Sequence, residues 1–98
     1  MIELIAKENA LQVSGMLNLY NVMALYEQSL SYFESYPLII IDFSTLQSSD
    51  SAGLAIAIEW IKLANKKHKQ LSLINFPQKL ATMAQAANLI PLIEKYLK

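Results

Sequence analysis

Serine and aspartate side chains cluster at positions 48 to 51 of this 98-residue chain, close before one of its only two glycines. The cluster, Ser48, Ser49, Asp50 and Ser51, lies between two apolar runs, so we expect a loop that leads into a helix. Each of these side chains can accept a hydrogen bond from the free N–H groups of a first helical turn, and Ser51 is the expected cap, because Ala52 and Gly53 then occupy that turn. A phosphate on Ser51 is also physically reasonable there, because the helix dipole favours negative charge.

Catalysis by these serines is not expected. The chain has one histidine, His68, which lies among lysines at the far end of the expected helix, roughly 25 Å from Ser51 at 1.5 Å per residue. It has no cysteine, so thiolate metal sites and disulfides are excluded, and a transition-metal site is not expected. It also lacks a phosphate-cradling glycine motif. We therefore expect no catalytic residues, no metal and no cofactor.

A helix over residues 52–66 should follow the serine cluster. Its core face has apolar spacing, and charged residues mark the opposite face. The core residues are Leu54, Ala57, Ile58 and Ile61, and the charged ones are Glu59, Lys62 and Lys66. Continued towards the helix start, the charged face passes through Ala52, Ala55 and Ile56, with Trp60 at its border. This pattern indicates either a docking surface or a surface that another helix or the C-terminal tail covers.

Gly53 favours the docking interpretation. A glycine in the first helical turn costs up to about 1 kcal/mol against alanine, and it leaves backbone open to a close approach. The predicted partner-binding residues surround it at the helix start. They are Ser49, Asp50, Ser51, Ala52, Gly53, Ala55, Ile56 and Trp60.

The elements that position this cluster are read from periodicity. Strands are expected near 3–6, 11–14, 38–43 and 70–74; Gly15 ends the second, and the third resembles a strand buried on both faces. A helix capped by Asn18 should precede Pro37, and another should run from Pro77 to Asn88. The first carries an apolar stripe of Leu19, Val22, Met23, Tyr26, Leu30 and Phe33. The order predicts an α/β fold, a mixed sheet of four to five strands with helices packed against it, and leaves the conformation of 89–98 open.

Length and composition limit the domain organisation, the partners and the location that we expect. The length predicts a single domain over 1–98, and the zero net charge gives no sign of a nucleic-acid partner. No apolar stretch approaches the roughly 20 residues that a membrane span needs. The first residues lack the basic and apolar regions of a signal peptide, so a cytoplasmic location is expected.

Two segments carry a family resemblance. "IIIDFSTLQSSDSAGLAIAI" resembles the signature of STAS domains, the sulfate transporter and anti-sigma factor antagonist family, and "LQVSGMLN" is similar to their strand followed by a Gly-x-Leu turn. "DSAGLAIAIEWIKLANKK" and "LATMAQAANLIP" are similar to helices of the small STAS subunit of Mla-type phospholipid ABC transporters. The resemblance implies a non-enzymatic partner of the cytoplasmic ATPase, in a system that moves phospholipids between bacterial membranes. It would be peripheral to the inner membrane only through that partner, with Ser51 at the partner-facing helix start.

One difference from the family pattern helps to distinguish two possible functions. Anti-sigma factor antagonists usually carry an acidic pair in a Gly-Glu-Leu-Asp turn, whereas this chain has Gly15-Met16-Leu17-Asn18. The loss of both carboxylates favours the transporter subunit. The alternative, an anti-sigma factor antagonist switched by phosphorylation of Ser51, remains open.

Overall fold

A five-stranded mixed sheet forms the centre of the protein, which is described here from a computed structural model over residues 2–98. The strands are β1 (Ile2–Lys7), β2 (Ala10–Leu17), β3 (Leu38–Asp42), β4 (Leu46–Ser49) and β5 (Gln70–Ile74). The sheet order is β1-β2-β3-β5, and β4 pairs with the far end of β2. β1 and β2 form an antiparallel hairpin, and the other pairs are parallel. The predicted mixed sheet with packed helices is confirmed.

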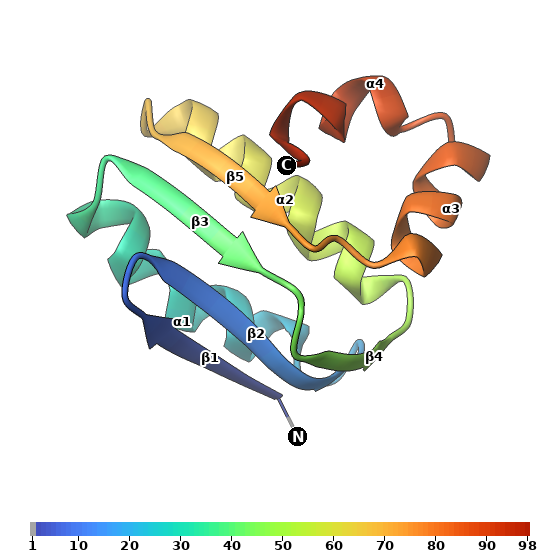
Figure 1. Cartoon of the computed structure of the whole chain (residues 1–98), viewed down its shortest axis with the longest axis horizontal. Helices are drawn as coiled ribbons and strands as arrows, with labels where there is room; N and C mark the ends of the chain where they lie inside the picture. The colour runs from blue at the N-terminus through green and yellow to red at the C-terminus, as the bar shows by residue number, and fades with distance from the viewer. Residues whose placement is uncertain (1) are drawn as a thin grey trace.

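Four helices accompany the sheet: α1 (Val22–Ser35), α2 (Ala52–Lys66), α3 (Gln78–Ala86) and the single turn α4 (Ile90–Ile93), which continues into a 3-10 turn, η1 (Glu94–Tyr96). α1 and α2 lie side by side against the sheet, whereas α3 and α4 extend beyond β5; α3 contacts α2, and α4 contacts α3 (Figure 1). The tail that the sequence left open is thus helical, and Leu97 bridges to Leu73 of β5.

The hydrophobic core lies on one face of the sheet. Alternate strand residues point into it, including Val13, Ile41 and Leu73, all fully buried. The residues between them point away and are partly exposed, among them Ile40. The expectation that the third strand is buried on both faces is therefore wrong, because the helices cover one face only; Leu38 remains 44% exposed.

Three boundaries differ from expectation. β2 does not end at Gly15 but continues to Leu17; Gly15 adopts a φ of 109°, where the register with β4 shifts. β4 occupies part of what was expected to be loop. α1 begins at Val22, because Asn18 and Asn21 exchange hydrogen bonds in the turn before it: the Asn21 Oδ1 accepts from the Asn18 N–H (2.9 Å), and the Asn18 Oδ1 accepts from the Asn21 N–H (3.2 Å).

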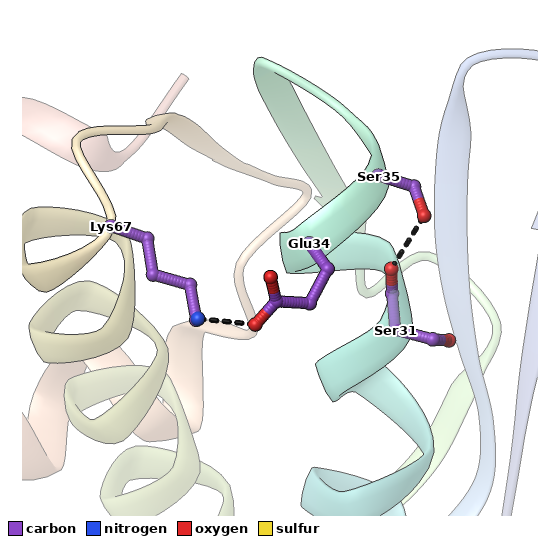
Figure 2. Close-up of polar contacts among 4 residues, drawn as sticks. All are labelled: Ser31, Glu34, Ser35 and Lys67. Carbon is purple, nitrogen blue, oxygen red and sulfur yellow. Dashed lines mark hydrogen bonds and ion pairs between the residues drawn. The ribbon is translucent and has the colours of Figure 1, made fainter.

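The ends of α1 and α2 are joined by an ion pair. Lys67, just past α2, reaches Glu34 near the end of α1, and the Ser35 hydroxyl donates to the Ser31 carbonyl (Figure 2). Lys67 lowers the pKa of Glu34 through the hydrogen bond and its charge. Lys67, one of the lysines around His68, thus makes an ion pair within the protein.

Candidate functional site

The serine cluster lies at one corner of the molecule, where the end of β2, β4 and the start of α2 come together (Figure 1). Ser48 and Ser49 belong to β4 and stand in register with Met16 and Leu17. The Asp50 N–H donates to the Leu17 carbonyl at 3.3 Å, which ties the loop to β2. Neighbouring strands therefore fix the position from which α2 begins.

Asp50, rather than Ser51, caps α2 with its side chain. The Asp50 Oδ1 accepts a hydrogen bond from the Ala52 N–H at 2.8 Å, and the Asp50 carbonyl accepts from the Gly53 N–H at 3.1 Å. Ser51 occupies the N-cap position without a capping hydrogen bond from its side chain. Its backbone φ and ψ of −62° and −12° are already helical, which is not the usual N-cap conformation.

The Ser51 hydroxyl is consequently available for contacts outside the protein. The residue is exposed, and its hydroxyl makes no hydrogen bond to the residues that the structure describes. Ser49 differs: it is 8% exposed, and its hydroxyl donates to the Asp50 carbonyl at 2.7 Å. Of these two serines in the cluster, Ser51 is the one whose oxygen a partner or a kinase can reach.

Gly53 allows neighbouring side chains of the same protein to pack closely against the start of α2. A Cβ at this position would lie 2.3 Å from the Ser49 Oγ and 2.7 Å from the Leu80 Cδ1. The glycine thus lets the start of α2 pack against β4 and α3. The expectation that it opens backbone to an outside partner is wrong, since Gly53 itself is buried.

The expected outward orientation of Ala52, Ile56 and Trp60 is also wrong. Their exposures are 1%, 2% and 0%. The other interpretation of the pattern, a surface covered by another helix, agrees with these exposures, because α1, the sheet and α3 all contact α2. Only a narrow stripe remains open, through Ala55 and the charged residue Glu59 and onward to the helix end.

Trp60 is held inside by a polar contact as well as by packing. Its indole N–H donates to the Ser29 hydroxyl of α1 at 2.8 Å, and that hydroxyl donates to the Tyr26 carbonyl at 2.6 Å. The ring also lies 6.4 Å from the Phe43 ring. Trp60 therefore joins α1 and α2 within the core instead of anchoring a partner.

We call the remaining exposed residues of the expected site the serine-loop surface: Asp50, Ser51 and Ala55. It is small and carries one charge. Ala52, Gly53, Ile56 and Trp60 support it from beneath, and Ser49 lies at its buried edge.

A second feature of this corner was not expected from the sequence. Four large apolar side chains between the end of β2 and the first turn of α1 are exposed, and we call them the apolar turn: Met16 (50%), Leu19 (70%), Tyr20 (99%) and Met23 (64%). Met16 is the register partner of Ser48, so the apolar turn adjoins the serine cluster. Leu19 and Met23 had been expected in the core-facing stripe of a helix, and that expectation is wrong. The sequence did contain a sign of this exposed surface, because these apolar residues lie in a turn that contains two asparagines.

A polar cluster lies at the carboxyl end of β3. The Asp42 Oδ1 accepts hydrogen bonds from the Ser44 N–H and the Asn75 Nδ2, each at 2.9 Å. Partial burial alone would raise the pKa of Asp42, but hydrogen bonds from Asn75, Ser44 and Gln12 outweigh it and lower the pKa. The cluster fastens the loops after β3 and β5.

Two cavities in the part of the chain that the structure describes are small. A cavity of about 160 Å³ lies between α1 and β3, and one of about 130 Å³ lies between β4 and α3. Both are below the several hundred Å³ of typical small-molecule sites. Residues 2–98 contain no cluster of three potential metal ligands, and none of their helices has the length and apolar character that crossing a membrane requires.

Comparison with known proteins identifies the family. The family model described as "Mlab, STAS domain" matches residues 3–94. The chain belongs to this STAS family. STAS domains of this kind are usually non-catalytic. Among curated proteins, none is similar enough in sequence to count as a match.

Solved structures show the same STAS fold. The phosphorylated form of the Bacillus cell fate determinant SpoIIAA aligns with a TM-score of 0.70 and 16% identity, over 100% of this chain and 89% of that one. The unphosphorylated form of the anti-sigma factor antagonist SpoIIAA aligns with a TM-score of 0.65 and 16% identity, over 87% of this chain and 82% of that one. At this identity the likeness concerns the fold.

Proposed function

We propose that this STAS domain is the non-enzymatic subunit that binds and supports the cytoplasmic ATPase of a phospholipid-transporting ABC complex. The single observation that carries the proposal is the Mlab family match over residues 3–94. The protein would act through contact alone, without a cofactor, and would reach the inner membrane only through the ATPase. Its role would be in maintaining lipid asymmetry of the outer membrane.

The chemistry of the corner supports a protein partner. Burying a leucine or methionine side chain contributes about 1.5–3 kcal/mol, and Leu19 and Met23 are each more than half exposed. Tyr20 is almost fully exposed, and tyrosine is among the residues that dominate interface energies. The serine-loop surface adds Ser51 as a hydrogen-bonding group and Ala55 as a position where a partner can come close. We infer that the partner covers both features at once.

Co-purification with the ATPase tests this proposal. Leu19→Asp should abolish binding, because a charge enters an apolar contact, and Ser51→Arg should do the same through bulk and charge. Leu92→Asp is the matched control, since Leu92 is 48% exposed on α4, away from the corner. All three should melt within a few degrees of the wild type. Wild-type recovery of the ATPase with Leu19→Asp and Ser51→Arg would refute the proposed surface.

The alternative function is a phosphorylation-switched antagonist of an anti-sigma factor. The observation in its favour is the exposed Ser51 hydroxyl, free of hydrogen bonds to the described residues at the start of a 15-residue helix. A phosphate there would add about two negative charges beside Asp50 and the apolar turn, which should release an apolar partner. Mass spectrometry of the protein purified from its own cells tests this. Stoichiometric phosphate on Ser51 and capture of a kinase instead of an ATPase would favour the antagonist.

A further inference from the structure

The strand β1 forms an unpaired edge of the sheet. Over residues 2–98 it pairs with β2 alone, and no element lies beyond its outer side (Figure 1). An open edge presents unpaired N–H and C=O groups to any strand of matching length and chemistry. The composition of β1, Ile2–Lys7, indicates what such a strand would be.

The backbone groups that face the open edge follow from the hairpin register. Glu8 and Asn9 form the two-residue loop between Lys7 and Ala10, and Glu8 has the positive φ, 48°, that such loops require at their first position. The pair that closes a two-residue loop is hydrogen-bonded, and hydrogen-bonded pairs then alternate along the ladder. Lys7, Ile5 and Glu3 therefore direct their backbone groups to β2. Leu4 and Ala6 direct theirs to the open edge.

The charges on β1 are self-complementary. Glu3 and Lys7 are both exposed, lie on the same face of the strand and are four residues apart. The ion pairs among the described residues, Lys62–Glu59 and Lys67–Glu34, involve neither of them. A strand with an acid at one end and a base at the other complements an antiparallel copy of itself.

We propose that β1 pairs with β1 of a second copy of this chain, antiparallel and centred on Ile5. In that register Leu4 faces Ala6 of the second copy, and these two positions carry the open backbone groups. Ile5 meets its own equivalent, and Glu3 faces Lys7 at both ends. A two-fold arrangement of this kind closes at the dimer and joins two sheets into one.

This pairing leaves the serine-loop surface free and does not depend on the proposed partner. β1 and β4 lie on opposite sides of β2, so the serine-loop surface is outside the edge contact. The dimer would present two such surfaces. A six-residue edge contact is small, so we expect a weak, reversible dimer.

Sedimentation equilibrium of the full chain tests the pairing. The wild type should pass from monomer to dimer below about 1 mM, the dissociation range of weak contacts. Glu3→Lys and Lys7→Glu should each weaken self-association about tenfold, because like charges then face each other at both ends. An equimolar mixture of the two variants should restore it, since every facing pair is again opposite in charge. Glu27→Lys, an exposed change on α1, is the charge control and should associate as the wild type does.

A backbone variant tests the register separately. Ala6→Pro removes an N–H that faces the open edge, so it should leave the monomer folded by circular dichroism and abolish the dimer. The proposal is overturned if the wild type stays monomeric throughout that range. It is equally overturned if the Glu3→Lys and Lys7→Glu mixture associates no better than either variant alone, or if folded Ala6→Pro dimerises normally.

Discussion

Neighbouring residues of α2 provide a matched test of which face of this helix is buried. Ile56 is 2% exposed, whereas Ala55 is exposed one position earlier. We substitute each by Asp. At Ile56 the change removes a buried side chain, at a cost of about 2–5 kcal/mol with its cavity, and leaves a carboxyl group in the core without a partner, at a cost of a few kcal/mol more. The total loss is about 5 kcal/mol or greater.

That loss is comparable with the whole free energy of unfolding of a 98-residue chain, about 5–15 kcal/mol. Ile56→Asp should therefore be unfolded or close to it at neutral pH. Ala55→Asp should stay within about 0.5 kcal/mol of the wild type, because the new carboxylate is solvated and lies near the N-terminus of α2, where negative charge is favoured.

Urea titration measures both variants through the fluorescence of Trp60, the only tryptophan and a fully buried one. The wild type and Ala55→Asp should give two-state transitions with similar midpoints, and Ile56→Asp should show the emission of a solvated indole without denaturant. If Ile56→Asp instead unfolds within about 1 kcal/mol of the wild type, Ile56 faces solvent and our description of α2 is refuted.

Three further substitutions test local contacts. Gly53→Ala should lower the free energy of unfolding by about 1–2 kcal/mol in urea titration, because overpacking against Ser49 exceeds the gain in helix propensity; a stabilised variant would contradict this. Ser29→Ala leaves the buried indole N–H of Trp60 unpaired and should cost about 1–3 kcal/mol, whereas unchanged stability would show that this hydrogen bond is unimportant. Asp42 has a pKa below its usual 3.8 in the folded state, so its stabilising contribution is present above that value and is lost as the pH falls through the lowered pKa. Asp42→Asn should therefore show a shallower loss of stability on acidification below about pH 4 than the wild type does, and equal slopes would argue against the Asp42 hydrogen bonds.

Much of the fold could be predicted because its signals are local. The helix over 52–66 and the strand over 70–74 were both expected within a residue of their bounds, since each carries its own periodicity and end signals. β4 could not be predicted in this way. Its four residues, Leu46–Ser49, are mostly polar, and their strand conformation depends on pairing with the end of β2.

The candidate site was predicted less well, for a different physical reason. The sequence correctly indicated a helix start rich in capping groups, but not which residues would be covered. Ile56 and Trp60 are buried in a helix that α1, the sheet and α3 all contact, and the sequence of one helix does not reveal which elements pack against it. Leu19 and Met23 have the spacing of a core stripe, but Leu19 precedes the first turn of α1 and Met23 lies on its open side.

Site-specific photocrosslinking in the intact complex tests the central claim most directly. A photoreactive phenylalanine derivative replaces Tyr20, which is 99% exposed in the apolar turn, or Tyr36, which is 54% exposed near the end of α1. Both substitutions exchange one exposed aromatic ring for another, so both proteins should fold. Crosslinking of the ATPase subunit from Tyr20 and not from Tyr36 is the result that we predict. Crosslinking from Tyr36 alone, or to another protein from Tyr20, would contradict the proposed binding corner.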